Sequence, residues 1–215
     1  MQVEVGGSRL QLLAQRAALL PAHRMLLVAD VHIGKATSFR RWGVPVPEAT
    51  TGDTLSRLDA LLAATGATQV VFLGDLLHSA RGRAAATLDA FARWRDSHTA
   101  LRLTLVRGNH DDHAGDPPAD WGVVCVDEPM RVDGLALAHH PEPVAGAYVL
   151  AGHLHPCAWV GGRAHDRLRL PCFHLGDQVG VLPAFGAFTG MHPVQAAPGD
   201  RVFVTTGDEL RALHC

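Results

Sequence analysis

Short motifs of aspartate, histidine, asparagine and glycine recur along the chain in an order that suits metal-assisted chemistry. In chain order they are Asp30-x-His32, Gly74-Asp75-x-x-His78, Gly108-Asn109-His110-Asp111, His139 and Gly152-His153-x-His155. Taken singly, each motif is also explained as a turn with an incidental histidine, because glycine and aspartate favour turns. That alternative does not explain five motifs in one chain, which together predict a metal site.

The residue types in these motifs indicate a pair of divalent metal ions. Two such ions about 3.5–4 Å apart need a shared ligand, and a carboxylate has two oxygens with which to bridge them. Asp75 is our choice for this bridge. Imidazole, carboxylate and amide ligands without a thiolate suit Mn, Fe or Zn better than Ca.

Strands are expected to position three of the motifs. The predicted strands Met25–Ala29, Gln69–Leu73 and Leu101–Val106 end next to, or within three residues of, Asp30, Asp75 and Asn109. Ligand sites in open α/β sheets assemble at the carboxyl ends of strands. Three separate segments are therefore expected to deliver metal ligands to one edge.

The rest of the pattern predicts two packed sheets with helices outside. A hairpin is expected from Val3–Val5 and Leu10–Leu13 around Gly6-Gly7, and helices are expected over residues 51–64 and 84–96. The second half has weak helical patterning and short expected strands at Val123–Val126, Leu135–Ala138, Tyr148–Leu150, Leu168–Phe173 and Val202–Thr205. We expect one α/β domain over residues 1–215.

Composition narrows the possible functions. The chain has 215 residues, 47% of them apolar, and a formal net charge of −2, which is not the basic field of a typical duplex DNA binder. The four cysteines show no disulfide framework. We find no signal-peptide pattern and no apolar run of about 18 residues, so we expect a soluble cytoplasmic protein without a membrane partner.

The five motifs resemble those of the calcineurin-like metallophosphoesterases. The resemblance implies a two-sheet sandwich flanked by helices, in four α-β-β-α layers. It implies that one metal is held by Asp30, His32, Asp75 and His155, and the other by Asp75, Asn109, His139 and His153. It also implies that His110 is the catalytic histidine facing the scissile phosphate and that Asp111 orients its ring. We favour His139 over the adjacent His140 as a ligand.

Two longer stretches suggest a subfamily. GDLLHS resembles the GDLFHS of SbcD-type nucleases, in which the histidine matching His78 is linked to nuclease action. The stretch DVHIGKATSFRRWGVPVPEATTGDTLSRLDALL, with GHLHP and LPAFGAFTGMHPV, resembles the bacterial DNA-ligase-associated (PdeM-like) metallophosphoesterases. This resemblance implies a manganese-dependent DNA endonuclease or phosphodiesterase acting on single strands, associated with a DNA ligase and a helicase in repair.

Basic residues near the motifs are candidate contacts for a nucleic-acid backbone. They are Lys35, Arg40, Arg81 and Arg107. The alternative is a solvated charged face, which is the usual role of surface arginines. Two other functions stay open: a phosphomonoesterase or cyclic-nucleotide phosphodiesterase with the same metals, and a scaffold that lost its chemistry. The scaffold ranks low because every expected position is filled.

Overall fold

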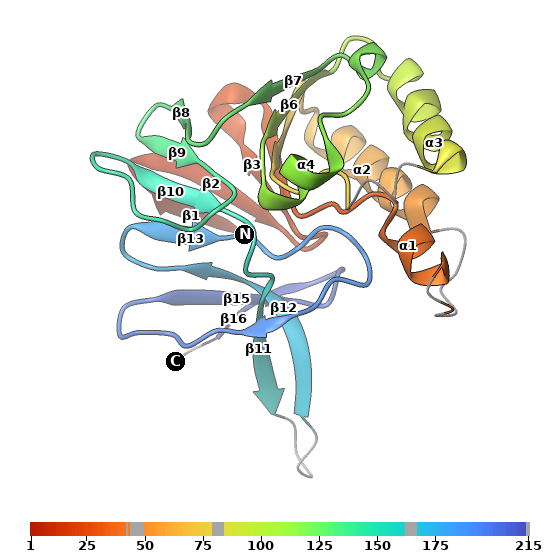
Figure 1. Ribbon diagram of the computed structural model, residues 1–215. Helices are drawn as coiled ribbons and strands as arrows, with labels where there is room; N and C mark the ends of the chain where they lie inside the picture. Colours follow the sequence, from red (N-terminus) through yellow and green to blue (C-terminus); the bar gives the residue numbers. More distant parts are fainter. Residues whose placement is uncertain (42, 44–49, 79–83, 162–166, 214–215) are drawn as a thin grey trace.

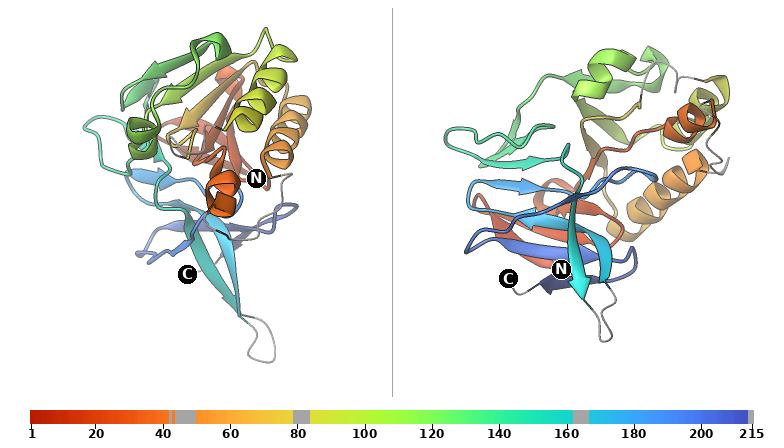
Figure 2. Two further views of the ribbon diagram at one scale, coloured as in Figure 1. Left: turned by 45° about the vertical axis from the view of Figure 1, so that its right-hand side comes forward. Right: turned by 60° about the horizontal axis from the view of Figure 1, so that its bottom comes forward.

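The computed structural model describes residues 1–41, 43, 50–78, 84–161 and 167–213, without the side chains of residues 37, 38, 41 and 112. Two β-sheets pack face to face, and helices cover the outer side of the first sheet (Figure 1). Figure 2 shows the same two layers from other directions, with the β11–β12 hairpin projecting away from the helices. The predicted two-sheet sandwich is confirmed.

The first sheet has seven strands, hydrogen-bonded in chain order. They are β1 Gln2–Val5, β2 Ser8–Leu13, β3 Ala17–Leu20, β4 Met25–Ala29, β5 Gln69–Leu73, β6 Arg102–Val106 and β7 Val123–Val126. The pairs from β1 to β4 are antiparallel, whereas β4, β5, β6 and β7 run parallel. The expected hairpin and strands are confirmed, and β3 was not foreseen.

The second sheet follows the order β14-β11-β12-β13-β10-β9-β8, with β15 paired to β12 and β16 to β15. Its strands are β8 Met130–Val132, β9 Leu135–Leu137, β10 Tyr148–Ala151, β11 Pro156–Gly161, β12 Arg167–Leu175, β13 Val179–Val181, β14 His192–Pro193, β15 Arg201–Thr205 and β16 Leu210–Leu213. Strands β9, β10 and β13 are parallel. This sheet therefore also gathers carboxyl ends of neighbouring strands at one edge.

The α-helices of the described residues all precede residue 115: α1 Lys35–Arg41, α2 Thr50–Thr65, α3 Ala85–Asp96 and α4 Asn109–Ala114. The predicted helices correspond to α2 and α3. Helix α2 buries Leu55, Leu58 and Leu62 on one face and ends at Thr65, where Gly66 follows with a φ of +62°. Among the described residues no α-helix covers the second sheet, so the expected fourth layer is absent there. Val144 and Ala147, from the connection between β9 and β10, pack on that sheet instead.

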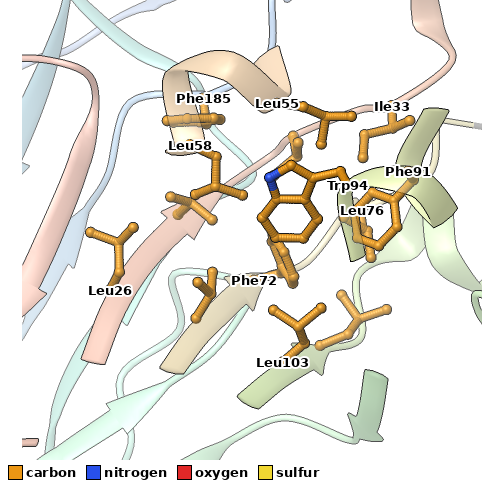
Figure 3. Close-up of a cluster of buried hydrophobic side chains, with 14 of the residues drawn as sticks. Leu26, Ile33, Leu55, Leu58, Phe72, Leu76, Phe91, Trp94, Leu103 and Phe185 are labelled. Atoms are coloured by element: carbon orange, nitrogen blue, oxygen red, sulfur yellow. The ribbon is translucent and has the colours of Figure 1, made fainter. Parts of the chain in front are cut away.

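Alternating side chains of the central strands form two cores. In β4, Leu26 and Val28 belong to the cluster under the helices, and Leu27 and Ala29 belong to the cluster between the sheets. Figure 3 shows the first cluster, with Trp94 beside side chains from the sheet and from α2. Within the described residues no helix has the length and apolar character needed to cross a membrane. Burial on both faces fixes the central strands that carry the motifs.

Candidate metal centre

The five motifs meet where parallel strands of both sheets end. Asp30 and His32 follow β4, Asp75 follows β5, Asn109 follows β6, His139 follows β9, and His153 and His155 follow β10. Hydrogen bonds donated by backbone N–H groups connect these turns: His32 N–H donates to the Asp75 carbonyl at 2.8 Å, and His153 N–H donates to the side-chain oxygen Asp30 Oδ2 at 2.9 Å. The first of these bonds joins two loops of one sheet, and the second joins the two sheets.

One ligand cluster contains Asp30, His32 and His155, whose ligand atoms lie within 4.8 Å of one another. His32 Nε2 is 3.4 Å from His155 Nε2, and His155 Nε2 is 3.5 Å from Asp30 Oδ1. Two ligand atoms about 2.1 Å from a shared ion are about 3.0–3.4 Å apart in octahedral or tetrahedral geometry. The observed spacing therefore fits a divalent cation between these side chains.

A second cluster is centred on His139 Nε2. This nitrogen is 2.9 Å from Asn109 Oδ1, 3.0 Å from His153 Nδ1 and 3.6 Å from Asp75 Oδ1. The other oxygen of the same carboxylate, Asp75 Oδ2, is 3.7 Å from His32 Nε2 in the first cluster. The two oxygens of Asp75 thus face different ligand sets, as a bridging carboxylate requires.

His139 and His140 have different surroundings. The His139 side chain is fully buried and contacts Asn109 and Asp75. The side chain of His140 is half-buried, and its Nδ1 lies 2.6 Å from Glu128 Oε1. His140 also forms a possible ligand group with His139 and His153. The contacts with Asn109 and Asp75 favour His139 as the ligand of the second cluster.

Left-handed backbone is concentrated at the ligands. Five of them have φ values between +48° and +69°: Asp30, His32, Asp75, His153 and His155. Such conformations cost about 1–3 kcal/mol each and persist where the surrounding structure enforces them, most often at functional sites. Gly74, with φ +74°, also meets a steric limit, because a Cβ there would lie 2.0 Å from His139 Nδ1.

Burial controls the charges of the site. It lowers the pKa of His32 and of His139, which keeps their rings neutral, the form that binds metal. Burial and the neighbouring Asp30 raise the pKa of Asp75. Burial also lowers the pKa of Lys35, while Asp30 and Asp75 oppose that shift. Two close buried carboxylates with few cations nearby form a site that a divalent ion stabilises.

His110 lies at the open side of the site. Its side chain is 39% exposed, its Nε2 is 4.0 Å from Asp75 Oδ2, and its Nδ1 is 2.9 Å from the His78 carbonyl oxygen. The His78 ring stacks on it with 5.2 Å between centroids. Burial, Lys35 and His110 lower the pKa of His78 to about 4. The structure therefore brings both predicted catalytic histidines together.

The expected role of Asp111 needs correction. Its buried carboxylate accepts hydrogen bonds from the backbone N–H groups of Gly108 at 2.9 Å, Asp75 at 2.7 Å and Leu76 at 3.1 Å. Burial raises its pKa to about 6 against the opposing effect of these bonds. Asp111 thus fixes the turns after β5 and β6, and the His78 carbonyl fixes the His110 ring.

The four predicted DNA contacts are differently placed. Lys35 is the first residue of α1, and the negative charges of Asp30 and Asp75 act on its pKa. Arg40 lies farther along α1, and Arg81 lies outside the described residues. The Arg107 guanidinium is engaged by Asp116 and Asp127, each at 2.8 Å. Among the three candidates that the structure describes, Lys35 is the one whose pKa responds to the metal-site carboxylates Asp30 and Asp75.

Glu128 is a site residue that the sequence analysis missed. Its Oε2 accepts the His139 N–H at 2.7 Å and the His140 N–H at 2.9 Å. Burial would raise the pKa of Glu128, but its hydrogen bonds with His140 outweigh burial and lower it. Glu128 follows β7, so the rule that found Asp30 and Asp75, a polar residue after an apolar strand, also applies to it.

The arrangement identifies the class of protein. The family model of calcineurin-like phosphoesterases matches residues 23–176, and the chain belongs to that family. The family uses divalent metals, and the ligand clusters fit such ions.

Among solved structures, the chain is similar to the nuclease MPE of Pseudomonas putida, with 45% identity, coverage of 99% of each chain and a TM-score of 0.87. A second match is the phosphoesterase Yfce of E. coli, with 16% identity, 83% of this chain and 86% of that chain covered, and a TM-score of 0.41. No curated protein matches the chain.

Proposed function

We propose that this metallophosphoesterase is a two-metal phosphodiesterase that cuts DNA, as a manganese-dependent single-strand endonuclease. The observation that carries the proposal is the Asp75 carboxylate, whose two oxygens face His32 on one side and His139 on the other. The similarity of nearly the whole chain to a Pseudomonas putida nuclease supports a nucleic acid as the substrate. Imidazole, carboxylate and amide donors without a thiolate are compatible with Mn²⁺, as they are with Fe and Zn.

The residues of the two clusters would hold the ions. Asp30, His32, Asp75 and His155 would bind one, and Asp75, Asn109, His139 and His153 the other. When bound, the ions supply a water of lowered pKa and neutralise charge on the phosphate. Asp111 and Glu128 keep the ligand loops in place through their hydrogen bonds to backbone N–H groups.

His110 is the proton donor in this proposal. The Nδ1–H group of its ring donates to the His78 carbonyl, so Nε2 is the nitrogen that takes up and releases the exchangeable proton. Nε2 lies on the same side as Asp75 Oδ2, at the exposed face of the site. The imidazolium form would donate its Nε2 proton to the leaving oxygen of the phosphodiester.

A substrate panel with Mn²⁺ tests the proposal. It compares circular single-stranded DNA, duplex DNA, a cyclic nucleotide and an aryl phosphate monoester. We expect cutting of the circle, which requires endonuclease action, and loss of that cutting in Asp75→Asn but not in the exposed control Asp120→Asn. Activity confined to the monoester or the cyclic nucleotide would refute the DNA assignment.

Manganese is tested separately by measuring metal content after reconstitution. Wild type should retain two Mn²⁺ per chain, and Asp75→Asn should retain fewer. Equal metal content in the two proteins would contradict the bridging role of Asp75.

A further inference from the structure

A cavity of about 350 Å³ lies beside the metal centre. The ligand His155 forms part of its wall, and segments far apart in the sequence form the rest: the β2–β3 turn, the β11–β12 pair, residues 184–191 and the end of β15. The His155 ring is tied to this wall, because its Nδ1 is 3.1 Å from the Gly190 carbonyl oxygen. A DNA strand with one phosphate at the metal centre would therefore pass next to this cavity.

The cavity is positively charged. Arg16 and Arg169 line it, and no aspartate or glutamate is among its described lining residues. Arg16 is half-buried, and its guanidinium forms no ion pair or side-chain hydrogen bond with any described residue. Arginine keeps its charge in proteins, so a half-buried unpaired guanidinium calls for an anion.

The charge of Arg16 also acts on a second arginine, Arg57. Arg57 contacts Phe185, the neighbour in sequence of the lining residue Ala184, with its guanidinium 4.1 Å from the Phe185 ring centroid and a hydrogen bond to the Phe185 carbonyl oxygen. Burial and the charge of Arg16 lower the pKa of Arg57 to about 10, against the opposing charge of Asp53. An anion at Arg16 would relieve this repulsion.

The other side chains suit an unpaired base. Leu170, Pro171 and Met191 contribute apolar surface, and Phe188 stands at the rim with 50% of its surface exposed. Phe188 has φ +56°, a strained conformation for a bulky residue, and such strain persists where structure enforces it. Proteins that bind single strands combine basic groups for the backbone with exposed aromatic rings on which bases stack.

We propose that this cavity binds an unpaired nucleotide next to the phosphate being cut, with Arg16 on a phosphate and Phe188 stacked on the base. The inference rests on the proposed DNA substrate and deepens it. A base inside a duplex is not available for such stacking unless it is flipped out, so the cavity gives the enzyme a preference for single strands.

The test uses Arg16→Gln and Phe188→Ala, with Arg211→Gln in β16 and Val124→Ala in β7 as exposed controls. For each protein, kcat/KM is measured on a single-stranded oligonucleotide and on bis(p-nitrophenyl) phosphate, which is too small to reach both sites. Phe188→Ala removes the stacking ring and Arg16→Gln removes the phosphate contact, so we expect the ratio of the two kcat/KM values, DNA over small diester, to fall about tenfold in Phe188→Ala and to fall in Arg16→Gln as well. The control variants should keep the wild-type ratio, and Phe188→Tyr should restore it.

An abasic substrate locates the contact. Moving a single abasic nucleotide along the oligonucleotide should reveal one position where wild type loses about tenfold and Phe188→Ala loses nothing further. If the cavity variants keep the wild-type ratio of kcat/KM on the oligonucleotide to kcat/KM on the small diester, the inference is refuted and the proposed function is unaffected. Wild type that hydrolyses the small diester but no DNA would refute both.

Discussion

Gly74 offers a direct test of the packing around the metal ligands, through the substitution Gly74→Ala. A methyl group there would overlap His139, with 2.0 Å to Nδ1 and 2.4 Å to Cγ. Gly7 is a matched control, because its φ of +72° is close to the +74° of Gly74 while nothing lies within 4 Å of its added Cβ. The two substitutions share the backbone effect and differ in the collision.

The magnitudes follow from these two terms. A left-handed alanine costs about 1–2 kcal/mol, and the reduced freedom of the unfolded chain returns about 0.4–1 kcal/mol. Gly7→Ala should therefore lower the free energy of unfolding by about 1 kcal/mol. Gly74→Ala adds overpacking of about 1–3 kcal/mol, for a total of about 2–4 kcal/mol. Because His139 is fully buried, the added methyl group would displace its ring, and the ring would lose its contacts with Asn109 and Asp75.

Two measurements check this prediction. Urea denaturation in EDTA gives the free energy of unfolding of the metal-free proteins, and elemental analysis after dialysis against Mn²⁺ gives metal per chain. We expect Gly74→Ala to be the less stable variant and to lose metal, and Gly7→Ala to keep the wild-type metal content. The reasoning fails if the two variants match in stability and both bind the full complement of metal.

Three further predictions concern other side chains of the site. His110→Ala should keep both metals and lower kcat by about 10²–10⁴-fold; loss of metal in that variant would show that His110 is misassigned. Glu128→Gln should weaken Mn²⁺ binding by about 10–100-fold in a titration, because the hydrogen bond from the His139 N–H to Glu128 helps to orient that ligand. An unchanged Mn²⁺ affinity would contradict this supporting role of Glu128. In EDTA, the free energy of unfolding should fall as the pH drops from about 6.5 to 4, because burial lowers the pKa of His78 to about 4 and the unfolded chain binds the proton first. His78→Gln should flatten this pH dependence, and an identical slope would contradict the assignment.

Much of the first sheet and the ligand motifs of the site were predictable from local sequence patterns. Apolar runs ending at Asp30 and Asp75 became parallel strands β4 and β5, and their carboxyl ends meet as predicted. β3 was missed because Ala17–Leu20 is four apolar residues without alternation, a pattern that a helix shares. Helix α4 has six residues, too few to show a helical period.

The parts that escaped prediction depend on long-range arrangement. Nothing local to His139 or His153 shows that the second sheet places the carboxyl ends of β9 and β10 against those of β4 and β5. The choice between His139 and His140 depends on contacts with distant segments, because His139 contacts Asn109 and Asp75 whereas His140 Nδ1 contacts Glu128. The role of Asp111 depends on the backbone N–H groups of a loop 36 residues away, at Asp75.

The metal ligands come from both sheets, so their positions depend on the hydrophobic side chains packed between the two sheets. Asp75 is carried by one sheet and His153 by the other, and side chains such as Leu73 and Leu150 determine how far apart these sheets stand. A conservative exchange such as Leu150→Met should cost less than about 1.5 kcal/mol of stability. The same exchange would shift two halves of a centre whose ions must sit about 3.5–4 Å apart, so turnover should decline well before the fold does.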